Sequence, residues 1–327
     1  MCYPGSQPTS IHGLTDVFAY ADHFARELSA SQQPFLRVTH WRERADGEGI
    51  ECTFDSLPGP FKAPVLVIVP ACQIAPPGSG HAPRSQEWIR GKHAEGAVVA
   101  AVCGGVFLLA DSGLLEGRRA TTHWLFADEL RRRFPALDVD ADRLVIDDHD
   151  VITAGGVLAW ADLGLSLVER LLGATVMHRT ARFMVMDPPG REQRLYGDFA
   201  PRLQHGDKAV LAIQHWLQAN AAAAGTVSEL AGRAGLGERT FLRRFVKATG
   251  MKPSEYTQRL RIARSRELLE FTRDSVERVS LAAGYEDPGG FRRIFKRVIG
   301  LSPGEYRRRF QRERLIESAG RATRTGS

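Results

Sequence analysis

The chain has 327 residues, of which 43% are hydrophobic and 25% charged, a balance typical of globular proteins that excludes collagen-like, low-complexity and disordered chains. No apolar run approaches the roughly 18–20 residues needed to cross a bilayer, and the first residues lack the pattern of a secretory signal. Cys2, Cys52, Cys72 and Cys103 form no CxxC pair, which argues against a disulfide framework or a zinc site and favours a cytoplasmic protein. At about 100–200 residues per domain, two domains are expected.

The net charge of +6 is unevenly distributed along the chain. Residues 206–327 contain 24 basic and 13 acidic residues and carry a net charge of +11, whereas residues 1–205 carry −5. A basic segment attached to a mildly acidic one is typical of a nucleic-acid-binding module fused to another domain. A basic helical domain without that function would have the same balance.

Residues 1–186 are expected to form an α/β domain. Short apolar, β-branched runs typical of buried strands occupy residues 35–41, 64–70, 98–103 and 151–153. Amphipathic segments typical of helices occupy residues 14–29, 85–93, 106–112, 125–134 and 157–172. This alternation predicts a parallel sheet flanked by helices on both faces.

A cysteine stands at the end of an apolar strand in this domain. Residues 98–103 read VVAAVC, and Gly104 and Gly105 then begin a predicted helix. A strand–turn–helix of this kind projects the Cys103 thiol from a tight elbow, where the helix N-terminus can lower its pKa. His123, further along the chain, offers an imidazole.

Residues 103–124 read CGGVFLLADSGLLEGRRATTHW, and this run resembles the ThiJ/PfpI branch of the class I glutamine amidotransferase-like superfamily. A looser resemblance spans most of residues 2–173, although relatives begin with an apolar strand of which only residues 1–3 are present here. The resemblance implies a sensor domain that binds a small molecule. The candidate ligand-binding residues are Cys103, His123, Trp124, Trp160 and Asp16.

Cysteine chemistry needs a thiolate, a proton-transfer partner, an orienting acid and oxyanion donors. The acidic position of many relatives falls on Ser10, and the glycine pair of their oxyanion loop is replaced by Pro70-Ala71-Cys72. Asp16 is the alternative acid. We therefore expect Cys103 to line a pocket and the protein not to be an enzyme, with a purely structural or a catalytic Cys103 as the alternatives.

The aromatic candidates also have two interpretations. His123, Trp124 and Trp160 are either packed residues or parts of a ligand site. If the two tryptophans flank the elbow, their indole faces would hold a cationic ligand by cation–π attraction. Trp160 stands where relatives often have a small residue, which would reshape the pocket. Cys2, Cys52 and Cys72 are assigned no role, and no metal or other cofactor is expected.

Residues 187–206 are predicted to form a linker, because Asp187-Pro188-Pro189-Gly190 interrupts the pattern and polar residues follow. The chain after it is expected to be all-helical, with a domain at residues 207–315 and a basic tail at residues 316–327.

The helical part contains an internal repeat. Residues 249–256 read TGMKPSEY and residues 299–306 read IGLSPGEY, while Phe241 and Phe245 recur as Phe291 and Phe295. Each copy has a helix, a glycine at the reversal and a second helix with one apolar and one basic side, which is the pattern of a helix-turn-helix. A solvated basic face would explain one copy, but two matched copies favour DNA binding.

Residues 206–310 resemble the DNA-binding domain of the AraC family of bacterial transcription regulators, whose second-copy hallmark reads GYEDPGGFRRIFKR at residues 284–297. In that family one long helix, here residues 254–269, bridges the two copies. The family's base-contacting positions fall on Arg239, Thr240, Leu242 and Arg243 in the first copy and on Gly289, Arg292 and Arg293 in the second. Phosphate contacts are expected from Arg244, Lys247, Lys296 and Arg297. Because Gly289 and Gly290 lack side chains, the second helix is expected to depend on its arginines.

The two resemblances together match the GlxA-like regulators. We therefore predict a transcription regulator whose N-terminal domain senses a small nitrogenous metabolite and whose C-terminal domain binds double-stranded DNA at two boxes about one helical turn apart. A homodimer is expected, with RNA polymerase as a partner if the protein activates transcription. The alternative is a cysteine-dependent hydrolase or isonitrile-hydratase-like enzyme that carries a DNA-binding domain.

Overall fold

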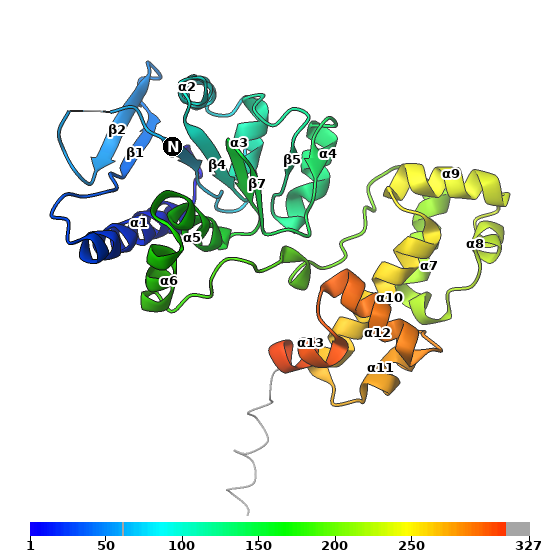
Figure 1. The fold of residues 1–327 in the computed structure, drawn as a ribbon. Helices are drawn as coiled ribbons and strands as arrows, with labels where there is room; N and C mark the ends of the chain where they lie inside the picture. Colours follow the sequence, from blue (N-terminus) through cyan, green and yellow to red (C-terminus); the bar gives the residue numbers. More distant parts are fainter. Residues whose placement is uncertain (61, 312–327) are drawn as a thin grey trace, which may run out of the picture. The chain divides into compact units, whose positions relative to one another are not determined.

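The computed structural model describes residues 1–60 and 62–311, which form two compact units that divide after Gly197 (Figure 1). The basic tail expected at residues 316–327, and the last residues of the expected DNA-binding domain, lie outside the described residues.

The first unit is built on a four-stranded sheet with the order β3-β4-β8-β7. Strands β3 (Leu66–Val69), β4 (Val98–Val102) and β8 (Val151–Ala154) are parallel, whereas β7 (Val145–Asp148) is antiparallel to β8. The predicted parallel sheet is therefore confirmed for β3, β4 and β8, and the edge strand β7, which the sequence did not indicate, is antiparallel. The reason is local: only His149 and Asp150 separate β7 from β8, His149 has a positive φ of 67°, and so short a connection joins antiparallel strands.

Two smaller sheets complete the strands of this unit. Strand β1 (Thr39–Glu43) pairs with β2 (Ile50–Asp55) as an antiparallel hairpin, and β5 (Arg119–Ala120) pairs with β6 (Asp138–Val139) in parallel. The strand expected at residues 35–41 begins later, because the Asp22 carboxylate accepts the backbone N–H groups of Phe35 and Leu36 and holds them in the preceding loop.

Helices cover both faces of the main sheet, as expected. On one face lie α1 (Pro8–Ser29), α5 (Ala159–Leu172) and α6 (Ala174–Phe183); on the other lie α2 (Pro83–Ala94), α3 (Gly105–Asp111) and α4 (Ala127–Arg133), the last preceded by the 3₁₀ helix η1 (Trp124–Phe126). Along β4, Val99 and Ala101 face α2 and α3, whereas Ala100 and Val102 face α1 and α5. This alternation on a strand without polar side chains is typical of a sheet that is buried on both sides.

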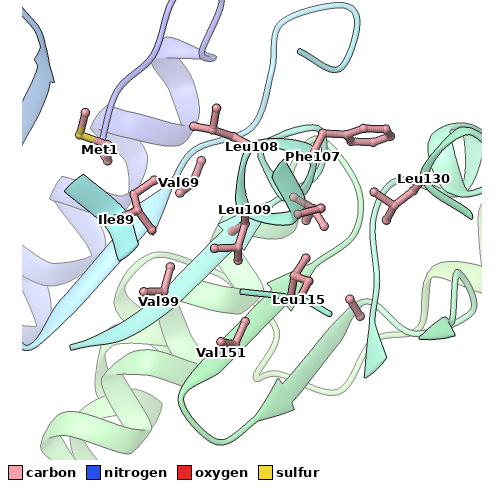
Figure 2. Close-up of a cluster of buried hydrophobic side chains, with 14 of the residues drawn as sticks. Met1, Val69, Ile89, Val99, Phe107, Leu108, Leu109, Leu115, Leu130 and Val151 are labelled. Carbon is pink, nitrogen blue, oxygen red and sulfur yellow. The ribbon is translucent and has the colours of Figure 1, made fainter. Parts of the chain in front are cut away.

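Figure 2 shows the core on the α3 side, with Val99 and Val151 of neighbouring strands lying near Leu109 of α3 and Ile89 of α2. All four side chains are at most 1% exposed. This core holds α3 against the carboxyl end of β4 and so fixes the position of the elbow between them.

The segment expected to be a linker is partly folded. Within it the 3₁₀ helix η2 (Gln193–Leu195) belongs to the first unit, where the side-chain amide of Gln193 donates to Thr122 O and accepts from Trp124 N. The Arg191 guanidinium forms a two-point ion pair with Asp162, which is 3% exposed. The chain thus leaves the first unit about ten residues later than the proline-rich sequence indicates.

The second unit is all-helical, as expected. Its helices are α7 (Lys208–Asn220), the 3₁₀ helix η3 (Ala221–Ala223), α8 (Val227–Arg233), α9 (Glu238–Thr249), α10 (Pro253–Phe271), α11 (Val276–Ala282), α12 (Pro288–Ile299) and α13 (Pro303–Phe310). The pairs α8–α9 and α11–α12 are the two copies of the repeat, and α10 joins them.

Candidate functional site

The outward face of α9 is the first candidate reading surface. Phe241 and Phe245 are fully buried on its inner side, and Gly250 ends the helix in the left-handed conformation at a φ of 76°. Arg239, Thr240 and Arg243 are exposed on the other side, and Leu242 is half-buried between the two. Within the described part of the chain, neither of these two arginines forms an ion pair, so both guanidinium groups are available to a ligand.

Arg244, expected to contact a phosphate, has a partner inside the unit. Its Nε and Nη2 atoms donate to the two carboxylate oxygens of Asp207 at 2.8 and 2.6 Å. Asp207 is also the N-cap of α7 and accepts the backbone N–H of Val210. The Arg244 hydrogen bonds lower the pKa of Asp207 to about 2. This contact fastens α9 to α7 and occupies the fork that a phosphate would need.

The second reading helix, α12, begins differently. The Asp287 side chain accepts the backbone N–H groups of Gly289 and Gly290, each at 2.8 Å, and Pro288 stands in the first turn. These backbone hydrogen bonds lower the pKa of the Asp287 carboxyl. The N-terminus of α12 is therefore capped by a carboxylate, and glycines stand there at the positions that Arg239 and Thr240 occupy in the first copy.

The arginines of α12 are exposed but have acidic neighbours. Arg292 pairs with Glu277 of α11, and Arg293 Nη2 lies 3.5 Å from an Asp287 carboxylate oxygen. Lys296 and Arg297, the expected phosphate contacts, are exposed near the end of the helix, as Lys247 is on α9. The helix thus presents a basic face, and acidic side chains partly neutralise the two arginines that are expected to contact bases.

The elbow of the first unit forms as the sequence predicts. Cys103 has a φ of +54°, a left-handed backbone rare for a residue with a side chain, and is fully buried. Its backbone N–H donates to Ala154 O at 2.7 Å, and the Thr122 hydroxyl donates to Cys103 O at 2.7 Å. The turn is therefore held by β8 and by the loop after β5.

Cys72, to which the sequence assigns no role, lies at this elbow. The Cys103 thiol hydrogen-bonds to Cys72, and this contact together with burial raises the pKa of Cys103. The same contact, with backbone N–H groups of Cys72 and Gly104, lowers the pKa of Cys72 to about 7. A Cβ atom on Gly104 would lie 2.2 Å from the Cys72 sulfur, so Cys72 packs directly on the first residue of the turn. A scan for cysteine at the ends of two neighbouring parallel strands would have found the pair, because such strand ends lie side by side.

His123 and Trp124 lie together beside the loop after β5. Their ring centroids are 5.3 Å apart, and His123 is 5.4 Å from Phe126. His123 Nδ1 accepts the backbone N–H of Leu125 at 3.1 Å and caps η1, and burial lowers the pKa of its imidazole. The neutral ring is held by a local cap, and Cys103 has Cys72, not His123, as its side-chain partner among the described residues.

Trp160 and Asp16 do not join this group. The indole of Trp160 packs on Gly13 of α1, where an added Cβ would lie 2.4 Å from the ring, so it is a packing residue between α5 and α1. Asp16 is exposed on α1, on the side opposite Leu14, Val17 and Phe18, which face the sheet. That Trp160 and Asp16 take part in a ligand site stays a prediction.

An α/β unit with a cysteine elbow followed by a paired helix-turn-helix defines a DNA-binding regulator with a sensing domain. Residues 63–170 match the DJ-1/PfpI family, and residues 230–309 match a helix-turn-helix domain family. The HTH-type transcriptional regulator CdhR of Pseudomonas aeruginosa is 30% identical over 228 residues, which are 69% of this chain and 67% of that regulator. The HTH-type transcriptional regulator GlxA of Rhizobium meliloti is 28% identical over 65% of this chain and 66% of its own. The chain belongs to this family of GlxA-like transcription regulators.

A third relative shares only part of the chain. Isonitrile hydratase of Pseudomonas putida is 34% identical over 116 residues, which are 34% of this chain and 47% of that enzyme. Part of this chain is therefore similar to an enzyme as well as to regulators. Among the helices of residues 1–60 and 62–311, none is both long and apolar enough to span a membrane.

Proposed function

We propose that the two helix-turn-helix copies read two DNA boxes about one helical turn apart, in direct orientation. The observation that carries the proposal is the bridge: α10 has 19 residues and at 1.5 Å per residue spans roughly 28 Å. With the offsets of α9 and α12 from its ends, one turn of about 34 Å is the distance that fits.

Selection of bound fragments from a random DNA pool by the full-length protein tests this proposal. We expect two different short motifs at a constant spacing of about 10 base pairs. Recovery of one motif alone, or of two motifs at variable spacing, would contradict it.

We propose that the first unit senses a small nitrogenous metabolite that binds at the elbow, against Cys103, His123 and Trp124. The site lies at the carboxyl ends of parallel strands, where α/β proteins generally bind ligands. Trp124, half-buried beside neutral His123, provides an indole face that attracts a quaternary or primary ammonium group. Trp160 is not part of the proposed site.

Thermal-shift screening of amines and amino acids tests the sensor proposal. A ligand at 100 times its Kd stabilises the folded state by about 2.7 kcal/mol, which a melting curve resolves. The shift should disappear in Trp124→Ala and persist in His178→Ala, a control on the exposed side of α6. A shift that survives in a folded Trp124→Ala/Cys103→Ala variant would refute the proposed site.

We propose that this unit binds its ligand without turnover and acts in the cytoplasm, where chromosomal DNA lies. Two features of the cysteines support the absence of turnover: the raised pKa of Cys103 favours its neutral thiol, and Cys72 packs on Gly104, where an oxyanion would need room. The two candidate positions for the orienting acid also support it, because the Ser10 hydroxyl accepts the backbone N–H of Ala71 and Asp16 faces solvent. Incubation with isonitriles and amides should give binding but no product. Product formation that is lost in Cys103→Ala would instead establish the enzyme alternative.

We propose a homodimer formed through the first unit, with RNA polymerase as a further partner at promoters that the protein activates. Exposed apolar side chains gather on α1 and around the end of α6: the ring centroids of Tyr20 and Phe183 are 4.8 Å apart, and Val185 is 91% exposed. Sedimentation of the full chain should show a dimer at micromolar concentration. Phe183→Glu should make it monomeric and Phe35→Glu, a control at an exposed site before β1, should not; a dimer in both variants would place the interface elsewhere.

A further inference from the structure

A contact between side chains and backbone joins the two helix-turn-helix copies in addition to α10 itself. It consists of η3, which precedes the first copy, Arg261 of α10, and Gly284 and Tyr285 in the turn of the second copy, and we call it the junction. Arg261 donates from Nε to Ala221 O at 2.8 Å and from Nη2 to the carbonyls of Ala222 at 3.3 Å and Ala224 at 3.4 Å. One guanidinium thus binds three backbone carbonyl groups in the segment that connects α7 to α8.

The second copy reaches the junction through its turn. Gly284, at a φ of +87°, packs against η3 so closely that an added Cβ would lie 2.4 Å from Ala222 O. The Arg261 guanidinium lies 5.6 Å from the centroid of the Tyr285 ring. Tyr285 in turn contacts Phe291 at 5.2 Å, and Phe291 is fully buried under α12. A continuous set of contacts therefore leads from η3 to the second recognition helix.

Beside the junction the copies do not close on each other. A cavity of about 520 Å³ opens between residues of α8 and α10 on one side and Tyr285 and Ile294 on the other. The Tyr285 hydroxyl is buried without a hydrogen-bond partner among the described residues. Since no side chain of residues 1–60 or 62–311 fills this space, we infer that α10 and the junction determine the angle between the copies.

We propose that Arg261 is a positioning residue that sets the box spacing at which α9 and α12 bind together. B-DNA turns once in about 10–10.5 base pairs, so one base pair corresponds to about 34° of rotation around the duplex. A bridging helix alone resists bending but allows the two copies to rotate about its ends. The hydrogen bonds of the Arg261 guanidinium to three carbonyl groups, together with the turn packed on η3, fix the angle between the copies. Loss of the junction should therefore appear as tolerance of altered spacing. The inference depends on the proposed two-box operator.

The test measures the affinity of the full-length protein for operators whose boxes stand at the selected spacing, or one base pair nearer or farther. Wild-type affinity should fall by about tenfold for a one-base-pair change, comparable to one mismatched base pair. In Arg261→Ala the ratio of the affinities at the selected and the altered spacing should fall to about twofold, because the variant loses affinity mostly at the selected spacing. Arg264→Ala is the matched control, because it removes the same charge from an exposed site on the same helix; it should keep the wild-type ratio.

If Arg261→Ala does not fold, Arg261→Lys replaces it in the test. This variant keeps the positive charge and most of the aliphatic side chain but not the guanidinium group, and its ratio should lie between those of wild type and of a variant without the junction. A folded Arg261 variant that keeps the wild-type ratio, or that loses affinity equally at all spacings, overturns the proposal. A wild-type protein that binds all spacings equally refutes the two-box operator instead, so the two failures are distinguishable.

Discussion

The two helix-turn-helix copies share a frame but differ in the face that would meet DNA. In both copies two phenylalanines of the second helix are fully buried and a left-handed glycine ends that helix. On α9 the outward positions carry Arg239 and Arg243 without acidic partners in the described chain, whereas α12 carries glycines, an anionic cap and Arg292 paired with Glu277. Burial constrains the frame equally in both copies but leaves the exposed faces free to differ. We therefore expect the first copy to supply most of the base discrimination.

The largest expected effect is that of Arg243→Ala. A guanidinium that bonds both O6 and N7 of guanine is worth about 1–3 kcal/mol of discrimination, so this variant should lose affinity for the cognate operator and relax its preference at one position of one box. Arg293→Ala should lose less, because Asp287 lies 3.5 Å from Arg293 and already partly neutralises it. Binding to single-base operator variants measures both. Equal losses in the two variants, or losses spread evenly over all operators, would count against unequal copies.

Arg244→Ala tests the contact that the first copy has and the second lacks, since Ile294 stands at the equivalent position. It should lower the unfolding free energy of the second unit and leave the pattern of base preference unchanged. Asp207 has its pKa lowered to about 2 by Arg244, so the contribution is complete above the unfolded carboxyl pKa of about 4 and is lost as the pH falls through about 2. Thermal melting between neutral and acid pH measures this. If Arg244→Ala instead melts at the same temperature as wild type at neutral pH but binds DNA more weakly, Arg244 contacts a phosphate, as the sequence predicts.

Lys247→Ala should weaken binding to all operator sequences to the same degree and reduce the slope of log affinity against log salt by about 1. Lys247 is exposed near the end of α9, where we expect its ammonium group to contact a phosphate rather than a base. The salt titration is performed beside Arg243→Ala. A base-dependent loss in Lys247→Ala would reverse the two assignments.

The smallest expected effect is a gain. Asp287→Asn keeps an oxygen that can cap α12 but removes the negative charge beside Arg293, so the second copy should become more like the first and bind DNA a few-fold more tightly. Asp274→Asn, which removes a charge from a half-buried position before α11, is the control. Weaker binding by a folded Asp287→Asn protein would show that the cap carboxylate supports recognition rather than opposing it.

The sequence predicted the second unit more completely than the first, for a physical reason. A repeat shows which positions are buried, because apolar residues such as Phe241 and Phe291 recur at the same place in both copies. Basic side chains between these positions lie on the surface whatever the details of the packing. The turn contact of Gly284 on Ala222 and the ion pair of Arg244 with Asp207 could not be predicted, because they join residues more than 35 positions apart in sequence.

In the first unit the motif located the elbow but not its chemistry. The buried strand, Gly104 and Gly105 were enough to place Cys103 at a strained turn. Its partner Cys72 comes from another strand, and which side chains reach the thiol depends on how the loops pack. Asp16 and Trp160 were candidates because of their residue types and the resemblance, but their surroundings depend on helix phase and packing: Asp16 is exposed on α1, and Trp160 covers Gly13.

The central claim, that two unequal copies read two boxes, is tested most directly by scrambling one box at a time. The full-length protein is titrated against the intact operator, against each half-scrambled operator and against a fully scrambled one at a single salt concentration. Our account predicts that scrambling the box read by α9 costs more affinity than scrambling the box read by α12, and that both half-scrambled operators bind more tightly than the fully scrambled one. Equal costs for the two boxes, or a half-scrambled operator that binds as tightly as the intact one, would contradict it.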